Sequence, residues 1–130
     1  MYVVSTPPDQ SVPHGFIERL RTAQRIAIFT HQRPDSDALG SQAALAIALR
    51  RLGKTHVQIV NFDKPPAPYA FLQKGIDGVE VVTYSPQWAA HGGSLDTVAI
   101  TDTCTYQQLE PAAEFLRQFL PELTKTLAPA

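Results

Sequence analysis

Cysteine is scarce in this sequence, because Cys104 is the only one among 130 residues. A lone cysteine can form neither an internal disulfide nor a structural zinc site of the four-cysteine kind. Chains without disulfides are typical of reducing compartments, so we expect a cytoplasmic protein. Cys104 itself is expected to be a small buried hydrophobe rather than a nucleophile, since no histidine has an evident link to it as a base.

An excess of either charge is also missing, since 11 Lys and Arg residues stand against 12 Asp and Glu, for a formal net charge of −1. This balance excludes strong undirected attraction to nucleic acid or to an anionic membrane, so any phosphate partner must be held locally. No apolar run approaches the roughly 20 residues needed to span a bilayer, and residues 1–14 lack the pattern of a secretory signal. We expect a protein that is neither exported nor membrane-spanning.

Glycine-rich phosphate loops are absent too. No Gly-x-Gly-x-x-Gly follows the first apolar run and no Gly-Lys-Ser/Thr loop occurs, which argues against dinucleotide-binding and P-loop functions. Gly40 and Ser41 could offer backbone N–H groups to a phosphate, but close packing of a helix on a sheet explains them equally well. The scattered arginines and lysines need no nucleic-acid partner, because solvation of helix surfaces accounts for them.

What the sequence does contain fits one domain over residues 1–130. Its side chains are 44% hydrophobic and 18% charged, and at this length folding can bury roughly 65–70% of the unfolded surface. The 11 prolines lie between the apolar segments, where they punctuate the chain. Residues 121–130 show no strand pattern and are predicted to form an irregular tail.

Apolar patterns along the chain predict strands that alternate with helices. Short apolar runs predict strands, helical spacing and cap residues predict helices, and a proline cluster at 65–68 predicts a turn. The predicted strands are 25–30, 57–61, 79–83 and 97–101, and the predicted helices are 16–23, 38–52 and 109–120. His14, His56 and His91 fall in or beside predicted loops and are expected to face solvent. Alternation of this kind predicts a three-layer, Rossmann-like α/β domain with a mostly parallel sheet.

Potential metal ligands follow two of these strands. Strand 25–30 is followed by His31, Asp35 and Asp37, and strand 97–101 is followed by Asp102. In open parallel sheets, ligands bind outside the carboxyl ends of the strands. Imidazole with carboxylates suits manganese, zinc or iron, and carboxylates with water suit magnesium or manganese. A carboxylate shared by two ions about 3.5–4 Å apart would make a phosphoryl-transfer site.

A structural alternative exists for part of this pattern. Pro34, Asp35 and Asp37 would then form only a turn and cap the following helix. For Pro-Asp-x-Asp taken alone this alternative is favoured, and the addition of His31 and Asp102 about reverses the balance. Both interpretations predict that Asp35 lies at the start of helix 38–52.

Two segments resemble the motifs of a known family. The run THQRPDSDALGS at 30–41 resembles the first motif of the DHH phosphoesterases, and TVAITDT at 97–103 resembles the second. Residues 108–116 resemble the helix that follows, and the similarity covers about residues 16–120. This superfamily includes RecJ-type exonucleases, nano-RNases that act on very short oligonucleotides, cyclic-dinucleotide phosphodiesterases and family II pyrophosphatases.

The resemblance implies a set of site residues. His31 and Asp35 would bind a first Mn²⁺, Asp37 a second, and Asp102 would bridge the two, with Asp35, Asp37 and Asp102 serving catalysis. The resemblance implies one or two Mn²⁺ ions, with Mg²⁺ as the alternative. The family's Asp-His-His motif should follow the next strand, yet no histidine follows His91. Its fourth-motif aspartate and C-terminal substrate domain are also absent, so the sequence resembles the N-terminal part of such a protein.

The function implied is that of a metal-dependent phosphoesterase acting on phosphodiester or phosphomonoester bonds in short oligonucleotides or nucleotides. Without the third motif, its activity is expected to fall by orders of magnitude. The alternative is a non-catalytic α/β module that binds metal or nucleotide weakly, or acts in protein association. A domain cut before its next strand would expose a sheet edge, so we also expect homodimers or association through that edge.

Overall fold

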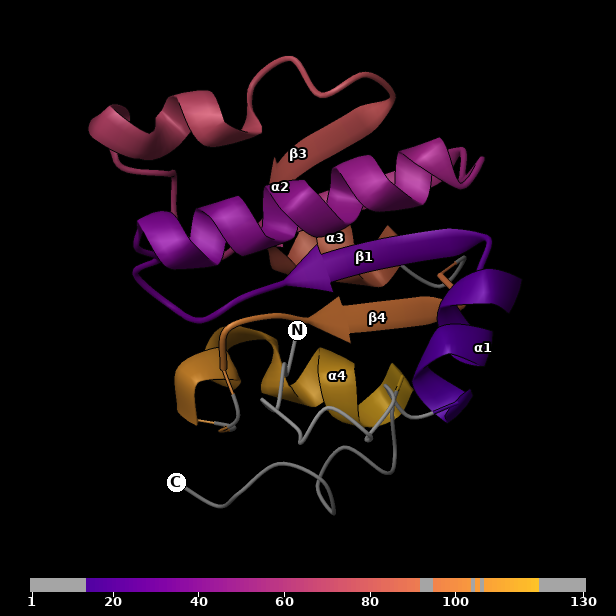
Figure 1. Cartoon of the computed structure of the whole chain (residues 1–130). Helices are drawn as coiled ribbons and strands as arrows, with labels where there is room; N and C mark the ends of the chain where they lie inside the picture. Colours follow the sequence, from indigo (N-terminus) through magenta and orange to yellow (C-terminus); the bar gives the residue numbers. More distant parts are fainter. Residues whose placement is uncertain (1–13, 92–94, 104, 106, 120–130) are drawn as a thin grey trace, which may run out of the picture.

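The computed structural model describes residues 14–91, 95–103, 105 and 107–119 (Figure 1). The predicted tail at 121–130, the last residue of predicted helix 109–120 and Cys104 lie outside these residues. Helices and strands alternate in the order α1 (His14–Thr22), β1 (Arg25–Phe29), α2 (Ser36–Arg51), β2 (His56–Asn61), η1 (Ala67–Gln73), β3 (Val79–Thr83), α3 (Pro86–His91), β4 (Thr97–Ile100), η3 (Gln107–Ala112) and α4 (Ala113–Phe119).

The four strands form one sheet in the order β3-β2-β1-β4. Every neighbouring pair is parallel, and Ile28 of β1 is in register with Ile59 of β2 and Ala99 of β4. The predicted α/β class and parallel sheet are therefore confirmed. Because all the strands are parallel, their carboxyl ends meet at one edge, which brings the segments after β1 and β4 together.

Helices cover both faces of the sheet, so the domain has three layers. Ile26 and Ile28 point to the face that α2 covers, where they pack in one core cluster with Leu49. Ala27 and Phe29 point to the opposite face, where η3 and α4 contribute their apolar side chains. Figure 1 shows α2 and α4 on opposite sides of β1 and β4. Residues 26–29 of β1 have no exposed surface, as expected for a strand buried on both faces.

An aromatic cluster fills much of the α3 and α4 side. Phe29 packs against Phe62, Tyr84, Trp88 and Phe115, with ring centroids 5.9–6.5 Å apart. Such pairs contribute about 0.5–1.5 kcal/mol each beyond the area they bury. Burial within the cluster raises the pKa of Tyr84 above its usual range.

A chain of three buried amides joins α2, β2 and η1. Gln42 Nε2 donates to the carbonyl of Ile28 (3.0 Å), and Gln73 Nε2 donates to Gln42 Oε1 (2.8 Å) and to the carbonyl of Leu39 (3.2 Å). Asn61 Nδ2 donates to Gln73 Oε1 (2.8 Å). Because main-chain carbonyls only accept, the amide nitrogens of Gln42 and Gln73 must be the donors, which fixes the orientation of all three amides. Asn61 Oδ1 then has no donor to accept from. Among described side chains, it is the one buried polar atom without a partner.

Three segments differ from the prediction. Only a turn was expected at 65–68, but residues 67–73 form the 3₁₀ helix η1. Helix 109–120 was expected to be continuous, but residues 107–112 form a 3₁₀ helix and the α-helix begins only at Ala113. The reason is Pro111, which has no N–H to donate and disfavours α-helical backbone at the preceding residue. The short helix α3 was not expected at all, although Ser85 Oγ caps it by accepting from Trp88 N (3.0 Å). A serine followed by Pro86 is a helix-start signal that could have found it.

The histidines outside the predicted site were expected to face solvent, and the two whose side chains the structure describes do so. His56 begins β2 and His91 ends α3, and both are exposed. Within the described ranges, no helix has the length and the apolar character that a transmembrane helix requires.

Candidate metal centre

Hydrogen bonds between β1 and β4 place the two loops that carry the predicted ligands. Thr101 N donates to the carbonyl of Phe29 (2.9 Å), and Thr30 Oγ1 donates to the carbonyl of Thr101 (2.9 Å). Both threonines are buried, so these contacts are shielded from water. His31 follows the first threonine and Asp102 follows the second. Their convergence is thus a consequence of parallel pairing at the carboxyl ends of adjacent strands.

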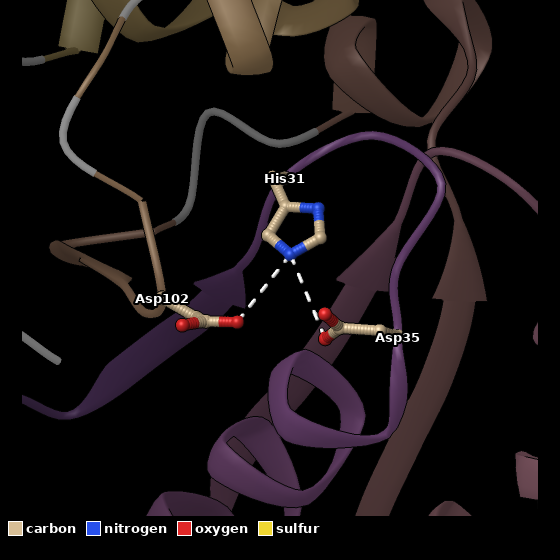
Figure 2. A group of neighbouring side chains, drawn as sticks. All are labelled: His31, Asp35 and Asp102. Atoms are coloured by element: carbon tan, nitrogen blue, oxygen red, sulfur yellow. Dashed lines mark ion pairs between the residues drawn. The ribbon is translucent and has the colours of Figure 1, made fainter.

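Three of the four predicted ligands meet at this point. His31 Nε2 lies 3.3 Å from Asp102 Oδ2 and 3.8 Å from Asp35 Oδ1. One possible ligand atom from each of these residues lies within 4.8 Å of the others. Figure 2 shows the imidazole between the two carboxylates, with its Nε2 directed at both. We call His31, Asp35 and Asp102 the metal-ligand group.

A hydrogen bond orients the His31 ring. Its Nδ1 lies 2.7 Å from the carbonyl oxygen of Gln32. Because a carbonyl only accepts, Nδ1 carries a proton, and Nε2 is the nitrogen that faces the carboxylates. Nε2 and the two carboxylate oxygens thus present electron pairs to one space, which a metal cation can bridge. This tautomer, fixed by a carbonyl on the second nitrogen, is the usual arrangement of metal-binding histidines.

Asp35 has a second, structural role. It is the N-cap residue of α2, with extended backbone, and its Oδ1 accepts from Ala38 N (2.9 Å). The turn-and-cap interpretation is thus correct for this residue. The capping oxygen, Oδ1, is also the one that lies 3.8 Å from His31 Nε2, so one carboxylate oxygen faces both the helix N-terminus and the site. The Asp35 side chain is 62% exposed, Asp102 is 38% exposed and His31 is 15% exposed. The group therefore has a part-buried imidazole and a carboxylate rim that opens to solvent.

Asp37, the fourth predicted ligand, is not part of this group. It is the second residue of α2, it is exposed, and the metal-ligand group found among described residues does not include it. The resemblance assigns Asp37 to a second ion, so its role stays a prediction.

Both ligand-bearing loops contain a residue with left-handed backbone. Arg33 has φ +50° and Asp102 has φ +59°, and no other non-glycine residue of the described part has a positive φ. Aspartate tolerates this region better than most residues, but arginine does not. Asp63, which follows β2, supports this turn because its Oδ2 accepts from Arg33 N (3.3 Å). Sequence reasoning missed Asp63, and its position after a third strand end was the signal available.

No family model matches the chain, and no solved structure matches it.

Proposed function

We propose that this protein binds a divalent cation through His31, Asp35 and Asp102 and uses it to hydrolyse phosphate esters in short oligonucleotides or nucleotides. The observation that supports this most is the convergence of one imidazole nitrogen and two carboxylate oxygens at the carboxyl edge of a parallel sheet. Mn²⁺ is the expected ion and Mg²⁺ the alternative, since this donor set suits manganese. The resemblance of residues 30–41 and 97–103 to DHH phosphoesterase motifs supports the same reaction.

The geometry of the three residues fits such an ion. Ligand atoms bound about 2.0–2.2 Å from one ion lie roughly 3–4.4 Å from one another. The separations of 3.3 Å and 3.8 Å from His31 Nε2 fall in this range. The hydrogen bond from His31 Nδ1 to Gln32 presents Nε2 without a rotation of the ring.

Each residue would contribute differently to the reaction. When bound, the ion supplies Lewis acidity, which activates water and stabilises the charge that develops on phosphoryl oxygens. His31 anchors the site from its buried side, whereas Asp102 lies at the exposed rim, where a phosphate can approach. Asp35 holds its position through the N-terminus of α2, so its carboxylate needs little reorganisation. By the resemblance, Asp37 would serve a second ion.

Melting with and without Mn²⁺ tests the binding half of the proposal. An ion that binds only the folded chain stabilises it by about 2.7 kcal/mol at a hundredfold excess over Kd. Asp102→Asn should remove most of this gain, and asparagine tolerates the left-handed backbone at that position. Glu80→Gln, an exposed carboxylate on β3, is the control and should keep the full shift. Equal shifts for the parent and Asp102→Asn would show that Asp102 is not a ligand.

Hydrolysis of a dinucleotide tests the catalytic half. With three residues in the group, we expect turnover only slightly above background at saturating Mn²⁺, because phosphoryl transfer demands a held substrate and often two ions. Asp35→Asn is the informative variant, since asparagine caps helices as well as aspartate does. Loss of the residual turnover in this variant supports the proposal, and turnover that survives it contradicts the assignment of Asp35.

A second candidate is a non-catalytic module, and the capping by Asp35 favours it. In that case the hydrogen bond to Ala38 explains Asp35, and a proton on His31 Nε2 explains the contact with Asp102. A module that acts only in protein association predicts no stabilisation by Mn²⁺, whereas one that binds metal weakly predicts stabilisation without any hydrolysis of the dinucleotide. A cytoplasmic location stays a prediction from the single cysteine.

A further inference from the structure

The 3₁₀ helix η3 contacts both loops that carry the metal-ligand group. The carbonyl of Gln108 accepts from Gln32 N (3.0 Å), and Gln32 is the residue after His31. The side-chain oxygen Oε1 of Gln108 accepts from the hydroxyl of Thr103, the residue after Asp102. One residue thus holds the loop after β1 with its backbone and the loop after β4 with its side chain.

Gln108 is well placed to fix these loops, because the residue next to it is anchored in the core. The next residue, Leu109, is fully buried in the core beneath α4. Thr103 is also held locally, since its hydroxyl oxygen accepts from Thr105 N (3.4 Å). Asp102, by contrast, has left-handed backbone and a side chain that is partly exposed. The position of Asp102 must therefore be fixed by its neighbours in the chain, because its own side chain is little packed.

We infer that Gln108 is a positioning residue for the metal centre, acting through the hydroxyl of Thr103 to set the separation of Asp102 from His31. This inference rests on the proposed function. The link predicts that metal affinity depends on a glutamine and a threonine that touch no ligand atom. A hydrogen-bond partner of a ligand side chain typically accounts for about 10–100-fold in metal affinity. Because Gln108 acts through the residue next to the ligand Asp102, we expect about tenfold, the lower end of this range.

The test is Mn²⁺ affinity, measured from the free-ion signal in electron paramagnetic resonance titrations of the full chain. Thr103→Val keeps the side-chain shape but removes the hydroxyl, and Gln108→Ala removes the acceptor while keeping the carbonyl that binds Gln32. We expect each variant to weaken Mn²⁺ binding by about tenfold. Thr103→Ser retains the hydroxyl and should bind Mn²⁺ with the affinity of the parent. Gln87→Ala, an exposed glutamine on α3, is the matched control and should bind as the parent does.

Two further readouts separate positioning from simple loss of stability. The double variant of Thr103→Val and Gln108→Ala should bind no more weakly than either single variant, because both remove the same link. The melting temperature of the metal-free chain should change little in Gln108→Ala, since its side chain is exposed. The inference is supported if metal-free Gln108→Ala melts as the metal-free parent does while its Kd for Mn²⁺ rises tenfold.

The outcomes distinguish this inference from the proposed function. If the parent binds Mn²⁺ and both single variants bind it equally well, the role of Gln108 is overturned and the proposed function stands. If affinity falls only in proportion to metal-free stability, Gln108 is structural and the inference is also wrong. If the parent itself binds no Mn²⁺, the proposed function fails and the inference fails with it.

Discussion

The guanidinium of Arg50 lies against the backbone of Gly78, so that a β-carbon on this glycine would come within 2.2 Å of Arg50 Cζ. Arg50 is held there because its Nε donates to the carbonyl of Asp77 (2.9 Å) and its Nη1 to the carbonyl of Lys54 (2.7 Å). This contact joins the end of α2 to the start of β3.

We expect Gly78→Ala to destabilise the protein by about 2–3 kcal/mol. Its φ of +74° costs a non-glycine residue roughly 1 kcal/mol, and the new methyl group must also displace Arg50 from its hydrogen bonds. Gly75→Ala is the control, because its φ of +70° is similar and no atom lies within 4 Å of the added carbon. It should cost only about 1 kcal/mol. Urea unfolding measures both, and equal losses would show that the Arg50 contact contributes nothing.

Asp96 is expected to make stability depend on pH in the acid range. Burial raises the pKa of Asp96. Four interactions lower it by more, namely those with the Thr97 hydroxyl, the Gln24 and Arg25 N–H groups and the charge of Lys54, so the pKa lies below its ordinary value. A lowered pKa in the folded state means that the stabilisation is full above about pH 4 and is lost as the pH falls through the folded value.

Comparing urea unfolding at pH 7 and pH 3 tests this prediction. Asp96→Asn should cost about 1 kcal/mol at pH 7, because it weakens the bonds to Gln24 N (3.0 Å) and Arg25 N (3.0 Å), and should cost less at pH 3. Glu110→Gln, on the exposed side of η3, should show neither effect. A loss that is the same at both pH values would exclude a role for the Asp96 charge.

The buried amide chain predicts a large effect for Gln73. Gln73→Leu has nearly the same volume but leaves Asn61 Nδ2, Gln42 Oε1 and the carbonyl of Leu39 without the partner that Gln73 provides. Each unpartnered buried group costs about 1–3 kcal/mol, so we expect a loss of about 3 kcal/mol or more. Gln58→Leu breaks only an exposed contact with Glu80 and should cost less than about 0.5 kcal/mol. Denaturant midpoints that shift equally would contradict a special role for the amide chain.

Self-association through the sheet edge is expected as well. In the part of the chain that the structure describes, β4 pairs only with β1, and Val98, Ala99 and Ile100 are half-buried on this edge strand. Unpaired N–H and C=O groups along such an edge favour pairing with a second copy. Light scattering should show an apparent mass that rises with concentration. A mass that stays monomeric at every concentration would exclude this association.

Local sequence determined the elements of this fold to a large extent. Residues 26–29 are apolar without alternation, which is typical of a strand buried on both faces, and β1 occupies Arg25–Phe29. Asp35 followed by helix formers predicts the start of α2, since capping depends only on residues three positions apart. Where a prediction was wrong, as at 109–120, the cause was also local, because Pro111 favours a 3₁₀ turn over a continuous α-helix.

The site depended on more than local sequence. The order β3-β2-β1-β4 decides that His31 and Asp102 meet, and that order follows from the packing of helices on both faces. The metal-ligand group found among the described residues includes Asp35 and not Asp37, although their spacing in the sequence suggests a pair. The hydrogen bonds that Gln108 accepts from Gln32 and Thr103, the residues after His31 and Asp102, have no sequence signature at all. The bond from Gln32 joins segments far apart in the chain, and the bond from Thr103 depends on how the loop after β4 folds back onto η3. Local propensity carries no information about either contact, because both form only when these segments pack together.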